Sequence, residues 1–147
     1  MNDPTLPQTQ INKMNLLSSE IEGIYHTAAF KAGLADSAMA VLYVLRVENN
    51  ECCISDICKT TGIGKQTVNS ALRKMERDGI IQLKAINGRK KTVCLTQKGV
   101  ALSETTADRL IDAENKAIAD WSVEEISEYL RLMRKFRDCL KKEIDKM

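Results

Sequence analysis

One stretch in the middle of the chain combines two short helical patterns with a hairpin pattern, and this order restricts the fold more than any other feature. Between the two helical patterns lies Thr61-Gly62-Ile63-Gly64, a turn favoured by the tolerance of glycine for positive φ. Asn87-Gly88, the dipeptide preferred in two-residue hairpin loops, separates two segments of strand character. The predicted elements are helices over 55–60 and 65–77 and strands over 80–86 and 91–96.

Two helices and a short strand are predicted before this segment. Apolar residues at spacings of three and four indicate helices over 9–31 and 37–47. We expect Gly33 to end the first helix and Ser37 to cap the second. A strand over 52–54 should follow, with Ser55 capping the next helix.

Two more helices are predicted after the hairpin. One long helix should cover 96–120, and the last should begin at Ser122, where Ser122 and Glu125 have the spacing of a capping box. The expected fold class is therefore mainly α with a small β-hairpin, and the length of 147 residues predicts a single domain over 1–147.

The charge is distributed unevenly along the chain. Residues 50–100 include ten basic and four acidic residues, so this segment carries +6 while the remainder carries −4. A basic middle segment between acidic flanks indicates a surface that binds a polyanion. The sequence shows no apolar run long enough to cross a bilayer and no export signal, so we expect a cytoplasmic protein without a membrane partner.

The helix over 65–77 is expected to carry the binding surface. Val68, Leu72 and Met75 share one face with Ala71 and should pack inward, which leaves the opposite face polar and basic. A helix fits the DNA major groove, where Arg pairs with guanine and Asn or Gln with adenine. The residues expected to contact DNA are Ser55, Lys65, Gln66, Thr67, Asn69, Ser70, Arg73, Lys74, Arg77, Arg89, Lys90 and Lys91.

The hairpin tip contributes the last three of these residues. Asn87-Gly88 places Arg89 at the crest of the hairpin, from which an arginine can enter a minor groove. Lys90 and Lys91 should bind the DNA backbone and make binding dependent on salt.

A wide apolar stripe runs along the last helix and favours dimerisation. Burial of such a stripe contributes roughly 25 cal/mol per Å², so we expect it to meet a second chain together with the first helix; packing on its own domain is the alternative. The residues of the stripe are Ile126, Tyr129, Leu130, Met133, Phe136, Leu140 and Ile144.

The five cysteines do not predict a disulfide framework, because their number is odd and an export signal is absent. The spacing of Cys52, Cys53 and Cys58 does not match a zinc site, so Cys53 or Cys58 is expected to pack as a small apolar residue. Cys94 should lie in a strand and Cys139 in the last helix. No metal, cofactor or catalytic residue is predicted, and an enzyme is not expected.

Residues 37–99 resemble the winged-helix core of MarR-type regulators. The resemblance rests on Ser55-Asp56-Ile57-Cys58, on the helix over 65–77 with the Asp78-Gly79-Ile80-Ile81 that follows it, and on Leu95-Thr96-Gln97-Lys98-Gly99. It implies a DNA-binding lobe over 33–97, with dimerisation helices over 9–32 and 98–147. The family wing usually carries Asp-x-Arg, whereas this chain has Asn87-Gly88-Arg89, so an ion pair that would orient the arginine is absent.

The resemblance also implies a function. It predicts a homodimer that binds double-stranded DNA at a pseudo-palindromic operator and acts as a repressor released by a small-molecule effector. Tyr25 and His26 would then line an effector cavity between the dimer helices and the lobe. Two alternatives remain open: a thiol redox-sensing regulator that uses Cys52, Cys53 or Cys58, and a winged-helix module that binds another protein.

Overall fold

The computed structural model describes residues 6–86 and 90–147 and divides into two compact units, Met1–Ile111 and Asp112–Met147. The lobe predicted at 33–97 lies within the first unit, and its separation from the flanking helices stays a prediction. The elements are α1 (Leu6–Lys31), α2 (Asp36–Val47), β1 (Glu51–Cys53), α3 (Ile54–Thr61), α4 (Lys65–Arg77), β2 (Ile81–Ile86), β3 (Lys90–Leu95), α5 (Gln97–Thr105), α6 (Ala107–Ala117) and α7 (Val123–Ile144).

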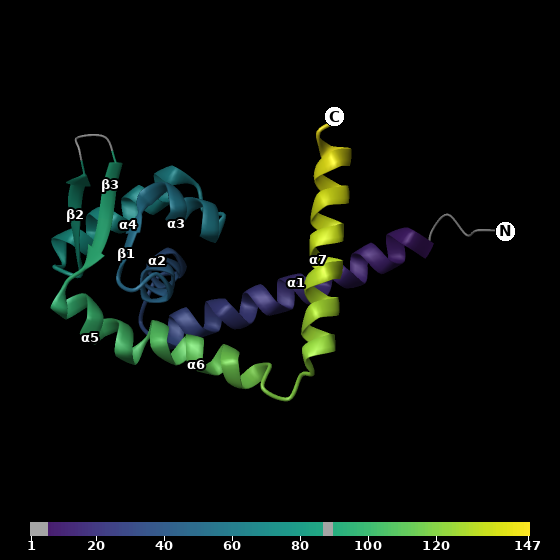
Figure 1. Cartoon of the computed structure of the whole chain (residues 1–147), viewed down its shortest axis with the longest axis horizontal. Coiled ribbons are helices and arrows are strands. Elements are labelled where there is room, and N and C mark those ends of the chain that lie inside the picture. Colours follow the sequence, from purple (N-terminus) through teal and green to yellow (C-terminus); the bar gives the residue numbers. More distant parts are fainter. Residues whose placement is uncertain (1–5, 87–89) are drawn as a thin grey trace. The chain divides into compact units, whose positions relative to one another are not determined.

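The core of the first unit is built around α2. Val41, Leu42 and Leu45 are fully buried on this helix, and apolar side chains from α3, α4 and the sheet join them in one cluster. Figure 1 shows α3 and α4 beside the hairpin formed by β2 and β3. The other buried members of this cluster include Ile57, Val68, Leu72, Ile81 and Val93. The predicted mainly α fold with a small antiparallel sheet is confirmed.

The three strands form one antiparallel sheet in the order β1-β3-β2. Val93 of β3 pairs with Cys52 on one side and with Leu83 on the other, which places the middle strand against the core. Both hairpin strands match their predictions within one residue at each end. Burial raises the pKa of the Cys52 and Cys94 thiols above the ordinary value.

Two asparagines turn the chain from α2 into β1. Asn49 and Asn50 have φ values of 58° and 73°, in the left-handed region that asparagine tolerates better than most residues. The Asn50 carbonyl accepts a hydrogen bond from the Leu95 N–H at 2.9 Å. This bond ties the start of the sheet to the end of β3.

The end of α4 is joined to the start of α5 by several polar contacts. The Thr96 hydroxyl caps α5 by accepting from the Gly99 N–H at 3.0 Å, and it donates to the Gly79 carbonyl at 2.6 Å. Lys98 donates to the Asp78 carbonyl at 2.7 Å. Gly79 has a φ of +75°, as expected for a residue that ends a helix in the left-handed conformation.

Arg46 links α2 to the first turn of α6. Its Nε and Nη2 donate to the two carboxylate oxygens of Asp108 at 2.7 and 2.6 Å, while its Nη1 donates to Asn50 at 2.9 Å. The hydrogen bond with Asp108 raises the pKa of Arg46 above its ordinary value. The Arg46 guanidinium therefore connects α2, the turn at Asn50 and the start of α6.

The single helix predicted over 96–120 is wrong, because the chain forms α5 and α6 with a break at Thr106. Thr106 has φ −129° and ψ −87°, outside the helical region, and its hydroxyl donates to the Leu102 carbonyl at 2.7 Å. Hydroxyl side chains that bond back to the preceding turn are known to bend helices. Periodicity alone does not reveal such a break, since apolar residues on both sides keep a helical spacing.

Two predicted N-caps are also wrong. The structure starts α2 after Ala35 and α3 after Cys53, and neither residue makes a side-chain capping bond. Ser37 and Ser55 therefore lie inside the first turn of their helices. A serine cap contributes only roughly 1 kcal/mol, so a capping residue by itself fixes the start of a helix weakly.

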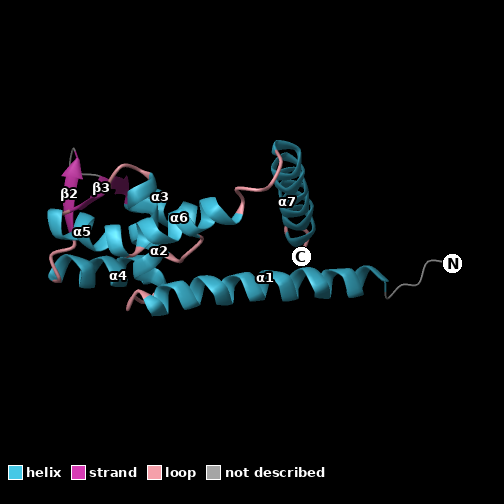
Figure 2. Ribbon diagram, turned by 90° about the horizontal axis from the view of Figure 1, so that it is seen from below, coloured by secondary structure: helices cyan, strands magenta, loops and turns pink. Residues whose placement is uncertain are grey.

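Helix α1 extends from the lobe and meets α2 only at its carboxyl end, where Ala29 is buried (Figure 2). Three of the regularly spaced apolar residues from which this helix was predicted, Met14, Ile21 and Ile24, are exposed. Among the described residues, no single helix is long and apolar enough to cross a membrane. Only α1 and α2 taken together reach that length and apolar character, and they meet at a bend of 90°.

The second unit consists of the end of α6 and α7. The predicted capping box is confirmed, with reciprocal bonds between Ser122 and Glu125 at 3.0 Å. Trp121 packs edge to face on Tyr129 with ring centroids 5.7 Å apart. All seven residues of the predicted stripe lie on α7, and none of the described α7 residues is buried.

We predict that Gly99→Ala destabilises the protein by about 2 kcal/mol, since overpacking of a fixed site costs roughly 1–3 kcal/mol. A methyl group there would lie 2.1 Å from the Ile80 carbonyl oxygen. The matched control is Gly23→Ala, where an added methyl group meets no atom within 4 Å apart from its own stretch of helix backbone, and the helix gains up to about 1 kcal/mol. Urea unfolding at one protein concentration measures both; equal stability of Gly99→Ala and the wild type would contradict the prediction.

We predict that Cys52 and Cys94 are the slowest of the five thiols to react with iodoacetamide at neutral pH. Only the thiolate reacts, and the raised pKa of both groups lowers the thiolate fraction, so their alkylation should require a higher pH than that of an ordinary thiol. Mass spectrometry of timed samples gives the rate at each cysteine, with the exposed Cys139 as the internal reference. Alkylation of Cys94 as fast as that of Cys139 would show that the sheet does not protect it.

Candidate nucleic-acid interface

Helix α4 is held in the lobe by one apolar face, as the sequence predicts. Val68, Leu72 and Met75 are buried, and Ala71 beside them is half-buried. The helix occupies Lys65–Arg77, the predicted range. Its orientation is therefore fixed by burial, which contributes about 1.5–3 kcal/mol for each large apolar side chain.

The opposite face of α4 is polar, basic and exposed. Arg73 reaches toward Ser70, with its Nη2 3.5 Å from the Ser70 hydroxyl, and Asn69 is half-buried beside them. Gly64 precedes the helix and has no side chain that could accept from the first N–H groups of α4. The exposed side chains of this face are Lys65, Gln66, Thr67, Ser70, Arg73, Lys74 and Arg77.

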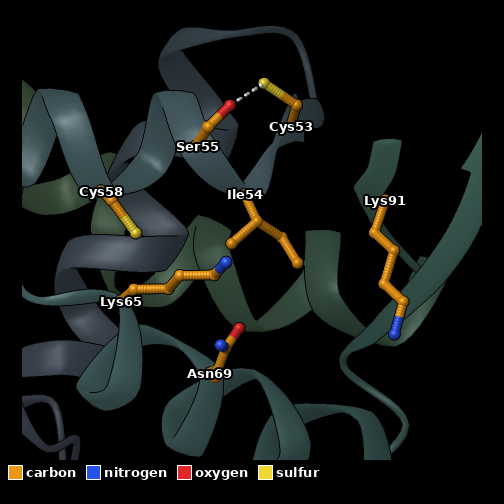
Figure 3. Close-up of a pocket in the computed structure, with 7 residues that line it drawn as sticks. All are labelled: Cys53, Ile54, Ser55, Cys58, Lys65, Asn69 and Lys91. Atoms are coloured by element: carbon orange, nitrogen blue, oxygen red, sulfur yellow. Dashed lines mark hydrogen bonds between the residues drawn. The ribbon is translucent and has the colours of Figure 1, made fainter. Parts of the chain in front are cut away.

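Four of the predicted DNA-contact residues surround one pocket of about 580 Å³. Figure 3 shows Lys65 reaching from the amino end of α4 toward Ile54, with Asn69 on the same helix and Lys91 on β3 across from it. Ser55 of α3 lies at the rim, where its hydroxyl is 3.2 Å from the Cys53 thiol. The pocket therefore lies where α3, α4 and β3 meet.

Arg89 lies outside the described residues, as does the side chain of Lys90. Lys91 is described and exposed on β3. The predicted DNA contacts thus form three groups: the exposed face of α4, the pocket rim formed by α3, α4 and β3, and the hairpin. In the hairpin group, Lys91 is the residue whose side chain the structure describes.

Three residues of the pocket were not among the predicted contacts: Cys53, Ile54 and Cys58. Cys58 also packs against the core, as predicted for a small apolar residue, whereas Cys53 donates a hydrogen bond to Asp56 at 2.9 Å. All five cysteines are free thiols. No local sequence signal identifies the pocket, because its wall forms only when β1, α3 and β3 come together.

Tyr25 and His26 lie on the exposed part of α1 and do not line this pocket. His26 places its Nδ1 2.9 Å from both carboxylate oxygens of Asp36 at the start of α2. Among residues 6–86 and 90–147, no group of three His, Cys, Asp or Glu side chains is arranged to hold a metal ion.

Solved structures share this fold over most of the chain. A MarR family regulator from Neisseria meningitidis superposes with a TM-score of 0.83 at 19% identity, covering 93% of this chain and 97% of that one. A MarR/EmrR family transcriptional regulator from Acinetobacter sp. ADP1 gives 0.71 at 21% identity, covering 100% of both chains. The Bordetella bronchiseptica regulator, whose DNA binding is regulated by 6-hydroxynicotinic acid, gives 0.64 at 20% identity, covering 85% of this chain and 98% of that one.

The sequence matches no curated protein closely. Residues 32–90, however, match the sequence model of the MarR family. This match covers α2, α3, α4 and the hairpin, which are the elements that build the interface described above. Residues 32–90 thus match the MarR family, and the chain as a whole has the fold of solved regulators of that family.

Proposed function

We propose that this protein binds double-stranded DNA as a homodimer and represses transcription until a small-molecule effector releases it. The observation that supports this function best is the division of α4 into a buried apolar face and an exposed polar and basic face. A helix held in this way presents its polar side chains as a rigid set to the major groove.

The proposed contacts divide by chemistry. Gln66, Asn69 and Arg73 carry the groups that read base edges, with Arg73 suited to the O6 and N7 acceptors of guanine. Arg89 is proposed to enter the neighbouring minor groove from the wing. The remaining residues, Ser55, Lys65, Thr67, Ser70, Lys74, Arg77, Lys90 and Lys91, are proposed to contact the DNA backbone or base edges.

Homodimerisation is proposed from the exposed apolar side chains of α1 and α7. Leu130, Met133 and Phe136 on α7 and Ile21 and Ile24 on α1 are all exposed in the single chain. A two-fold dimer would present two recognition helices about one DNA turn apart, so the operator should be pseudo-palindromic. We place such a regulator in the cytoplasm.

Release by an effector is proposed by analogy with the Bordetella regulator, which responds to 6-hydroxynicotinic acid. Tyr25 and His26 remain the proposed contacts for an effector beside the dimer helices. The contact of the His26 ring with the Asp36 carboxylate joins α1 to α2, so a ligand that displaces it would loosen the packing between these helices.

We predict that Arg73→Ala weakens DNA binding by about 10–100-fold and relaxes the base preference at one position in each half-site, because a bidentate pair is worth roughly 1–3 kcal/mol. Arg89→Ala should weaken binding without changing the major-groove preference. Selection from a random DNA pool provides the operator, and gel shifts at several salt concentrations provide the affinities. Arg134→Ala on α7 removes an equal charge and serves as control; wild-type affinity in both Arg73→Ala and Arg89→Ala would refute this docking.

We predict that Phe136→Glu converts the dimer to a monomer of 16.5 kDa and lowers operator affinity by about 100-fold, as expected when two linked binding sites are separated. The control is Val123→Glu, which adds the same charge at the first turn of α7, where a carboxylate is favourable. Light scattering gives the mass and gel shifts give the affinity. A dimeric Phe136→Glu protein would place the interface elsewhere.

A further inference from the structure

Arg46 lies where α2, the turn at Asn50 and the start of α6 meet, and it is not one of the proposed DNA contacts. Its guanidinium donates to both carboxylate oxygens of Asp108 at 2.7 and 2.6 Å and to the side-chain oxygen of Asn50 at 2.9 Å. The side chains of Arg46 and Asp108 are 19% and 32% exposed, whereas every other ion pair of the described residues is more than half exposed. Water and salt therefore screen this pair less than the surface pairs, and the two parallel bonds to Asp108 hold the guanidinium in one orientation.

Asn50 connects this arginine to the strand that leads into the hairpin tip. Its N–H donates to the Leu45 carbonyl at 2.6 Å, and its carbonyl accepts from the Leu95 N–H at 2.9 Å. Leu95 is the last residue of β3, and the first two residues of the same strand, Lys90 and Lys91, are proposed DNA contacts. The carboxyl end of β3 is thus tied to the end of α2 through a single residue.

Helix α2 also supports the helix that is proposed to enter the major groove. It packs against both α4 and β3, and Leu42 of α2, Leu72 of α4 and Val93 of β3 belong to one apolar cluster. Apolar burial is non-directional, whereas a hydrogen bond weakens steeply when its angle changes. The polar link through Arg46 and Asn50 is therefore the contact that defines where the base of β3 lies relative to the helix behind α4.

We propose that Arg46 is a positioning residue for DNA binding, which holds the base of β3 on α2 so that Lys91 and the exposed face of α4 keep one spacing. The proposal rests on the proposed DNA-binding function, since this spacing matters only when both elements bind one duplex. Hydrogen bonds to DNA need donor–acceptor distances of roughly 2.7–3.2 Å, so a small shift of β3 removes its contacts. Arg46 acts through Asn50 and does not itself contact DNA.

Hydrogen exchange followed by NMR tests the link without DNA. Arg46→Met keeps a long side chain that cannot donate, and it should accelerate exchange of the Leu95 amide about tenfold. The Val68 amide of α4, which donates to the Gly64 carbonyl at 3.0 Å, is the internal reference and should change by less than about twofold. Arg109→Met removes the same charge from the exposed surface of α6 and should change neither rate.

A double-mutant cycle tests the effect on DNA binding, with the operator selected from a random pool as the probe. Arg46→Met should weaken binding about tenfold in the wild type and about tenfold again in Arg73→Ala, which lacks a contact from α4. In Arg89→Ala/Lys91→Ala the same change should cost less than about threefold, because the hairpin contacts that depend on the spacing are already absent. An effect on folding alone would lower the affinity by one factor in all three backgrounds.

Asn50→Gly breaks the same link without changing charge. Glycine adopts the φ of 73° without strain and loses only the side-chain acceptor, so this variant should reproduce the results of Arg46→Met in both experiments. The matched control is Asn49→Gly, because the exposed Asn49 also has a positive φ, 58°, and its substitution should leave both readouts unchanged. Arg46→Lys keeps the charge but lacks the planar fork, so it should resemble Arg46→Met.

The outcomes separate this proposal from the function on which it rests. Equal acceleration of the Leu95 and Val68 amides, one factor of affinity loss in all three backgrounds, or wild-type behaviour of Arg46→Lys would overturn the positioning role and leave DNA binding intact. Failure of the wild type to bind any duplex would instead refute the DNA-binding function, while hydrogen exchange would still decide whether Arg46 anchors β3. If circular dichroism shows that Arg46→Met does not fold, Asn50→Gly decides both experiments.

Discussion

The close approach of Gly99 to the Ile80 carbonyl is the contact on which the interface depends. An added Cβ at Gly99 would lie 2.1 Å from that oxygen, so only glycine allows α5 to begin this near to the turn after α4. Because the two segments lie this close, the Thr96 hydroxyl donates a hydrogen bond to the Gly79 carbonyl, and the Lys98 ammonium donates one to the Asp78 carbonyl. The carboxyl end of α4 is held by these polar contacts, and its middle is held by burial of Val68 and Leu72. Both constraints act on the face away from solvent, so the polar face stays open.

The bounds of an element could be predicted from the sequence where a single physical preference, such as helical amphipathicity, acted alone. The ends of α4 could be predicted because Gly64 and Asp78-Gly79 bound a strongly amphipathic segment, and the face it exposes followed from the same spacing. Predictions failed where two preferences competed. Ser37 and Ser55 are good capping residues, yet both helices start earlier, after Ala35 and Cys53. The break at Thr106 depends on a hydroxyl bond to Leu102, which a helical apolar period does not reveal.

The candidate site likewise has one part that the sequence could predict and one part that it could not. Residues on one helix face could be named from the sequence, because a single element fixes their relative positions. The pocket could not be predicted, since Cys53, Lys65 and Lys91 come from three elements whose approach depends on the whole core. Four of its lining residues, Ser55, Lys65, Asn69 and Lys91, also belong to the surface proposed for DNA.

The interruption at Thr106 has a mechanical meaning for the first unit. A bend formed at glycine would leave the backbone free to swing, whereas this one is made by a β-branched residue whose hydroxyl is engaged and whose neighbour Ala107 is fully buried. The carboxylate of Asp108, the next residue, accepts two hydrogen bonds from the Arg46 guanidinium. The break between α5 and α6 is therefore held on both sides by contacts within the first unit. The arginine that binds Asp108 comes from α2, the helix that also packs against α4.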